Sequence, residues 1–354
     1  MDRDALVDAV RHGAVLRGDD LCGADLTGAV LAGATLEDVK LRDALLGGCD
    51  LRESTLFGCD LAGADLTGAR LERATLHRSA LPGASLRRAS LAATKFIGCD
   101  LRGARFDEAD LLAPSFVEAR LSGASFGGAA LDRAVLVDCA LDRADLRGAT
   151  VRACVVTGAD LRSCLVDGAR FELAVLMEST LAGMDLRGCT FVACQFNGAD
   201  LRGADLRGAT LERCNFKGAT LEDARLAGAD LRQALLVEAK VARADLSRCA
   251  LDLALFLDAD LALADLRGAS AVQAQFTRAR CVGTRFGGAD LTYADFTHAD
   301  ATGADFDGAT VRRARFHRTS LDGAMGRGAG ALGDDEALAA AEDFRSPYGA
   351  RSTR

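Results

Sequence analysis

Aspartate is the residue whose type and spacing most suggest chemistry in this 354-residue chain, which carries a net charge of −8. Asp often stands directly before a leucine and recurs five residues later, as at Asp200 and Asp205. A regular row of carboxylates is either a solvated surface or a charged surface that another macromolecule recognises. The aspartates are therefore candidate binding residues, provided that the fold holds them in rows.

Catalytic chemistry finds little support in the other polar residues. The histidines are His12 near the N-terminus and His77, His298 and His317 at outward positions of a repeat, and none lies in a recognisable nucleophile motif. Glycine-rich stretches such as Gly203 to Gly208 lack the strand-to-helix context of a phosphate-binding loop. We therefore expect no catalytic residue and no cofactor, and the sequence predicts that the protein is not an enzyme.

The twelve cysteines would permit disulfides or a metal site. No Cys-x-x-Cys pair and no histidine at ligand spacing accompanies them, so we expect no metal. Ten of them stand where alanine is usual in the repeat: Cys49, Cys59, Cys99, Cys139, Cys154, Cys164, Cys189, Cys194, Cys214 and Cys249. A free cysteine there acts as a small hydrophobe, which indicates a reducing compartment.

A five-residue repeat positions all of these residues. A large apolar residue, here called the centre, stands at every fifth position from Leu16 to Leu321 without a change of register. Every centre is Leu, Phe or Val apart from Ala271, Cys281 and Ala301, and the residue two positions earlier is usually Ala. Each unit thus requires one bulky and one small residue, and a period this strict takes precedence over local propensity.

The period excludes a long α-helix, because five residues advance about 500° around the helix axis and leave no continuous buried face. In an extended chain the small residue and the centre point to the same side, whereas the next such pair points to the other. The chain must therefore turn once per unit, and right-angle turns close a coil in four units. Successive coils would then hydrogen-bond as parallel strands about 4.8 Å apart.

The phrase Ala-Asp-Leu-x-x, plainest from Ala199 to Gly208, resembles the repeat of the pentapeptide-repeat family. The resemblance implies an all-β fold, a right-handed quadrilateral parallel β-helix (solenoid) of about 15 coils with short capping helices at both ends. It determines function less closely, because the family includes gyrase-binding, DNA-mimicking proteins and also members of no known activity.

The repeat divides the chain into three segments. Residues 1–13 carry Leu6 and Val10 at helical spacing and Gly13 as a stop, which predicts an N-terminal capping helix. Residues 14–325 are expected to form one continuous pentapeptide-repeat β-helix. Four units break the small-residue rule, at Asp19, Val39, Pro114 and Met184, and the coils at Pro114 and Met184 are expected to bulge.

Residues 326–354 read as a glycine-rich link, a C-terminal helix and a tail. The resemblance to gyrase-binding proteins implies that such a helix joins two copies end to end, with Leu338 and Phe344 as the contacts here.

No run in the sequence approaches the roughly 18 apolar residues of a bilayer span, and Met1 to Gly13 is too charged for a signal peptide. We therefore expect a cytoplasmic protein with no membrane contact.

Four units per coil give the rod four faces, named here by their first centres: face A from Leu16, face B from Leu21, face C from Leu26 and face D from Leu31. Faces B and C carry rows of Asp that could imitate DNA phosphates, although an Arg often follows two residues later and dilutes the charge. The candidate DNA-mimic residues are Asp145, Asp160, Asp185, Asp200, Asp205, Asp245, Asp260 and Asp265.

Face A differs, because its outward positions are often apolar and Asp precedes a centre there only at Asp295. The candidate interface residues are Val117, Val135, Val137, Val155, Val175, Met177, Leu235, Val237, Leu255 and Leu257. An exposed apolar stripe on a soluble protein usually marks an interface, most simply here a side-by-side homodimer. Filling of a tolerant face by β-forming residues is the alternative interpretation.

Together these features predict a non-enzymatic binding rod. The family resemblance favours a DNA mimic that binds and modulates or protects a type II topoisomerase, DNA gyrase, with resistance to a topoisomerase poison as one outcome. The alternative is a structural scaffold for protein–protein interaction with no topoisomerase role. Either way we expect a protein partner and no direct contact with nucleic acid.

Overall fold

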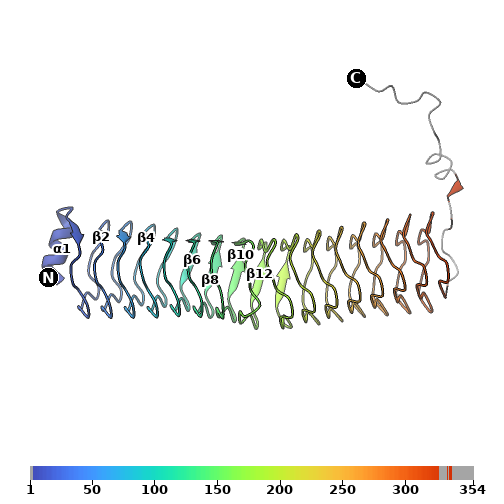
Figure 1. Ribbon diagram of the computed structural model, residues 1–354, viewed down its shortest axis with the longest axis horizontal. Coiled ribbons are helices and arrows are strands. Elements are labelled where there is room, and N and C mark those ends of the chain that lie inside the picture. Colours follow the sequence, from blue (N-terminus) through green and yellow to red (C-terminus); the bar gives the residue numbers. More distant parts are fainter. Residues whose placement is uncertain (1–2, 327–332, 334, 337–354) are drawn as a thin grey trace, which may run out of the picture.

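The computed structural model describes residues 3–326, 333, 335 and 336. It shows a row of stacked coils that forms a long rod, with helix α1 (Arg3–Arg11) lying against the first coil (Figure 1). Leu6 of α1 is buried in the core of that end. Gly13, at φ +71°, ends the helix, and the N–H of Ala14 bonds the C=O of Ala9 at 3.0 Å, as predicted from the glycine.

Two parallel sheets run along the rod, one on face A and one on face D. The sheet on face A has the order β1-β2-β3-β4-β5-β7-β9-β11 and comprises β1 (Val15–Arg17), β2 (Thr35–Glu37), β3 (Thr55–Phe57), β4 (Thr75–His77), β5 (Lys95–Ile97), β7 (Ser115–Val117), β9 (Val135–Val137) and β11 (Val155–Val156). The sheet on face D has the order β13-β12-β10-β8-β6 and comprises β6 (Asp110–Leu112), β8 (Ala130–Asp132), β10 (Thr150–Arg152), β12 (Arg170–Glu172) and β13 (Thr190–Val192).

Every pairing joins residues one coil, or 20 positions, apart. Leu16 lies opposite Leu36 on face A, and single parallel bridges continue the same step as far as Asp305 and Met325. The predicted parallel β-solenoid with a short helix is therefore confirmed.

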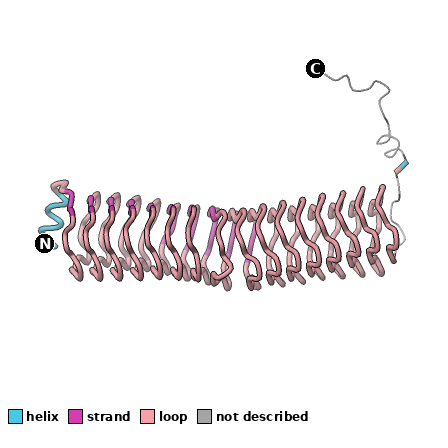
Figure 2. The backbone as a smooth tube through the Cα atoms, in the orientation of Figure 1, coloured by secondary structure: helices cyan, strands magenta, loops and turns pink. Residues whose placement is uncertain are grey.

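The number of strands in one sheet is smaller than the predicted number of coils, which is about 15. The longer sheet holds eight strands, and Figure 2 shows strands only in the first part of the rod. The reason lies in the turns. Where the turn after a centre is closed by a hydrogen bond, such as Ala199 N–H to Phe196 C=O at 2.9 Å, one residue of the unit remains in the ladder. Where that bond is missing, as after Leu36, three residues remain extended and form a strand.

Pro114 does not make its coil bulge, and this expectation is wrong. The ladder is intact at that residue, because Val135 donates its N–H to the C=O of Pro114 at 3.0 Å. Proline has no N–H with which to close the turn after Leu111. The open turns of face D accordingly begin with β6, at this proline.

Met184 does disturb the ladder, as predicted. It stacks between Cys164 and Ala204 at a position that requires a small residue, and all three are buried. Leu165 and Asp185, which the repeat should bridge, form no bridge in the described structure. An apolar cavity of about 40 Å³ lies inside these coils, with Met184 in its wall. Overfilling one position thus leaves imperfect packing beside it.

The rest of the core consists of stacked identical positions. Phe96 lies over Phe116 with ring centroids 5.0 Å apart, and Phe106 over Phe126 at 4.9 Å. All twelve cysteines are free, and burial raises the pKa of the Cys249 thiol to about 12, as expected for an inert packing residue. The predicted C-terminal helix, with Leu338 and Phe344, lies outside the described residues.

Truncating one centre should cost far more stability than changing one small residue. Leu206→Ala should lower the free energy of unfolding by about 2–5 kcal/mol, because Leu206 is fully buried in a stack of bulky residues. Cys214→Ala should leave it nearly unchanged, since alanine is the usual residue at that position. Denaturant midpoints of the two variants measure this difference, and a large loss for Cys214→Ala would contradict the packing role of the cysteines.

Candidate binding surfaces

The Asp rows lie where the repeat predicts them, one residue before the centres of faces B and C. Asp185 and Asp205 are bridged neighbours on face C, as are Asp245 and Asp265. Each carboxylate accepts the backbone N–H two residues further on, for example that of Arg207 on Asp205 at 3.3 Å. This local bond fixes the side chain at the corner of the coil.

The carboxylates of these rows are mostly paired with arginine. The Arg two residues later forms an ion pair of 2.6–2.7 Å with Asp145, Asp160, Asp185, Asp200, Asp205 and Asp265. Asp260 instead pairs with Arg280 of the next coil at 3.0 Å. Asp245 accepts the N–H of Ser247 at 3.0 Å and has no ion pair among the described residues.

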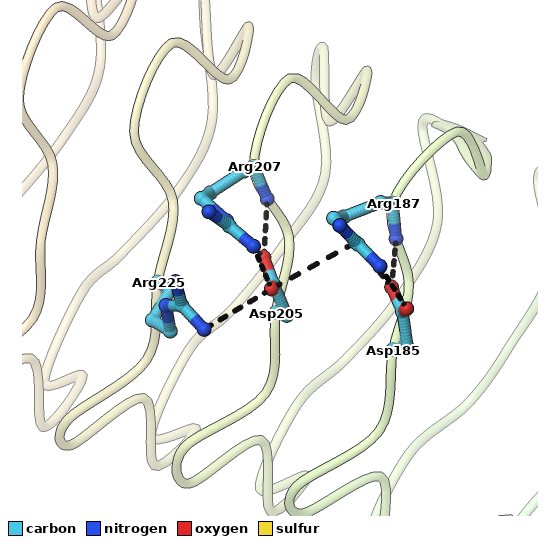
Figure 3. A network of polar contacts seen from close by, with 5 residues as sticks. All are labelled: Asp185, Arg187, Asp205, Arg207 and Arg225. Carbon is cyan, nitrogen blue, oxygen red and sulfur yellow. Dashed lines mark hydrogen bonds and ion pairs between the residues drawn. The ribbon is translucent and has the colours of Figure 1, made fainter.

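Asp205 shows how the pairing extends between coils (Figure 3). It contacts Arg207 at 2.6 Å, Arg225 of the next coil at 3.4 Å and Arg187 of the previous coil at 3.8 Å. Hydrogen bonds from Arg187 lower the pKa of the neighbouring Asp185 to about 2. Asp185 therefore remains ionised, but the guanidinium groups beside the rows cancel most of their charge.

The apolar residues of face A form two patches and not the single stripe that the sequence predicts. Patch 1 consists of Val117, Val135, Val137, Val155, Val175 and Met177, and patch 2 of Leu235, Val237, Leu255 and Leu257. Between them lie Gln195, Asn197, Asn215 and Lys217, and Asn215 donates to the side-chain oxygen of Gln195 at 3.1 Å.

Most side chains of the patches are half-buried, because each packs against its neighbours one coil away. Val137 and Met177 are the most exposed, at 39% and 37%. Sequence reasoning missed Leu173 and Leu253, which are 51% and 45% exposed at the corner leading into face A. Both have positive φ and stand at a turn position where the repeat usually has glycine. A leucine in place of that glycine is the sequence signal that could have identified them.

The described residues give no metal-binding cluster. Within that part of the chain, no group of three or more His, Cys, Asp or Glu side chains could hold a metal ion. His317 was expected to point outward but is 2% exposed, and Asp335 donates its N–H to His317 Nδ1 at 3.1 Å. None of the described helices has the length and apolar character that crossing a bilayer requires.

Solved structures similar to this chain include other repeat proteins. HetL, a pentapeptide repeat protein involved in heterocyst differentiation regulation in Nostoc sp. strain PCC 7120, is 25% identical over 89% of this chain and 96% of its own, with a TM-score of 0.27. QnrB1, a plasmid-mediated fluoroquinolone resistance protein, is 18% identical over 54% and 94%, with a TM-score of 0.32. A pentapeptide repeat protein of the Arabidopsis thaliana thylakoid lumen is 28% identical over 37% and 70%, with a TM-score of 0.22.

No curated protein matches the chain. The family model described as pentapeptide repeats matches most of it, at residues 12–48, 36–73, 49–88, 84–112, 115–152, 157–191, 194–233, 214–251 and 279–318. These matches cover coils from both ends of the rod and agree with the five-residue period and the 20-residue ladder. The chain therefore belongs to the pentapeptide-repeat family.

Proposed function

We propose that the protein is a non-enzymatic rod that serves as a scaffold for protein–protein interaction, with patch 1 and patch 2 as its contact surfaces. One observation carries this proposal: face A presents apolar side chains in two patches that each span several coils, whereas the Asp rows of faces B and C are largely neutralised by arginine. Apolar side chains gathered on one face of a protein are typical of an interface.

A second copy of the chain is the simplest occupant of face A. A stable interface buries about 800 Å² per partner, and at about 25 cal/mol/Å² such an area gives a gross free energy large enough to offset the cost of association. Leu173 and Leu253 widen the two patches at their edge. The polar Gln195 and Asn215 between the patches would lie at the centre of such a contact, where their side chains can still form hydrogen bonds.

Charges placed in the two patches should separate the copies. Val137→Glu combined with Leu257→Glu should yield monomers in light scattering under conditions where the wild type is dimeric, because each change buries a carboxylate against apolar surface. Val30→Glu combined with Leu263→Glu is the matched control, since those residues are 52% and 61% exposed on faces D and B. Dimers that survive the first pair of changes would contradict side-by-side association through face A.

A second candidate function is binding to a type II topoisomerase by DNA mimicry, as some members of the family do. The Asp rows on two adjacent faces of the rod favour it, because their spacing along the rod is regular. The arginine beside most of these carboxylates counts against it, since a basic DNA-binding surface would meet a nearly neutral row.

A supercoiling assay with purified DNA gyrase, with and without a quinolone-type poison, distinguishes the two candidates. If the rows imitate DNA, the protein should inhibit gyrase, less so as salt rises, and less again when Asp185, Asp205 and Asp265 become Asn. The opposite variant, with Arg187, Arg207 and Arg267 changed to Gln, should inhibit more strongly because it frees the same carboxylates. Inhibition that changes neither with salt concentration nor in the two variants would count against mimicry. If the protein does not inhibit gyrase at all, the scaffold function is the one that remains.

A further inference from the structure

A hollow of about 90 Å³ opens on the surface at the corner between faces A and B, near the middle of the rod. Leu136, Leu141 and Val156 line it with apolar surface, and Asp138, Cys139 and Thr157 line it with polar groups. A single water needs about 10–15 Å³ on the same scale, so the hollow has room for a branched aliphatic side chain. It adjoins patch 1, because Val137 and Thr157 are consecutive outward residues of face A.

The ladder is interrupted at this hollow. One coil earlier, the corner is closed by Glu118 N–H to Val137 C=O at 2.9 Å and by Leu121 N–H to Ala140 C=O at 2.8 Å. The equivalent N–H groups of Asp138 and Leu141 have no partner in the described structure, and neither does that of Asp160.

The matching acceptors are open as well. The C=O groups of Cys139 and Thr157 receive no N–H from the described residues, and Ala140 and Asp160 form no bridge. The corner closes again in the next coil, where Gly158 N–H bonds Met177 C=O at 2.9 Å. Backbone donors and acceptors thus surround one small depression with both polar and apolar lining, and a polypeptide backbone supplies groups complementary to the donors and the acceptors.

Free carboxylates border the same corner. Glu118, Asp138 and Glu178 are exposed and form no ion pair within the described part of the chain. Further along the same corner the acidic residues are paired, Glu238 with Lys217 at 3.8 Å and Asp258 with Arg278 at 2.6 Å. The negative charge beside the hollow is therefore available to a basic partner, unlike that of most of the Asp rows.

We propose that this hollow is the docking site for an extended segment of a partner protein. One aliphatic side chain of the segment fills the hollow between Leu136, Leu141 and Val156. The backbone of the segment bonds the open N–H and C=O groups of Asp138 and Thr157, and a flanking Lys or Arg lies beside the carboxylates. The inference rests on the proposed scaffold function and adds to it a site distinct from patch 2.

Panning a library of random peptides displayed on phage against the full chain tests the site directly. We expect enrichment of peptides with an aliphatic residue flanked by Lys or Arg. Thr157→Trp, which covers the hollow, should weaken their binding about tenfold or more. Thr277→Trp is the matched control, since Thr277 holds the same position on face A where the corner is closed by Asp258 N–H to Thr277 C=O at 3.1 Å.

Thermal midpoints of the two tryptophan variants should agree, and Asp138→Lys provides a second variant if Thr157→Trp fails to fold. Peptides that bind Thr157→Trp and Asp138→Lys as tightly as the wild type, or no enrichment, would overturn the inference. Binding lost with Leu257→Glu but kept with Thr157→Trp would overturn it while leaving the scaffold function intact. Binding lost only with the hollow variants, in a wild type that forms no dimer, would support the hollow and exclude the homodimer.

Discussion

The whole structure depends on one packing constraint: each five-residue unit must place one small and one bulky side chain inside a coil of fixed size. Successive coils are joined by parallel bridges at a constant step of 20 residues, so identical positions stack along the rod. A stack of alanine or cysteine next to a stack of leucine or phenylalanine fills most of the interior. A departure in one unit therefore affects a neighbouring coil, as at Met184, where the bridge between Leu165 and Asp185 is missing from the described structure.

This dependence explains how far the sequence could predict the structure. The period alone determines the solenoid, its register and the outward position of the Asp rows. The effect of Pro114 was misjudged because a missing N–H matters in the turn and not in the ladder. The burial of His317 depends on a contact from residues well beyond it in the sequence, and the repeat contains no sign of that contact. The split of face A follows from Gln195 and Asn215, which are visible in the sequence but interrupt the stripe only once the coils are stacked.

The surfaces follow from the same stacking. An Arg two residues after an Asp pairs with it locally, whereas Arg225 reaches Asp205 only because the coil brings them together. The sequence therefore reveals the acidic rows more readily than their neutralisation. On face A the same register aligns valines and leucines, and this is why an apolar contact surface is better supported than a charged one. Both surfaces depend on stacked coils, whereas the hollow exists because the ladder opens between two of them.

Amide hydrogen exchange along the rod tests most directly whether the stacked coils form one hydrogen-bonded ladder with a single interruption near the middle. We expect strong protection of ladder amides such as Leu121, Leu201 and Leu221, and rapid exchange at Asp138, Leu141, Asp160 and Asp185, whose ladder bonds are missing. Uniform protection through residues 138–185 would contradict the interrupted ladder, and rapid exchange throughout the rod would contradict the stacked coil itself.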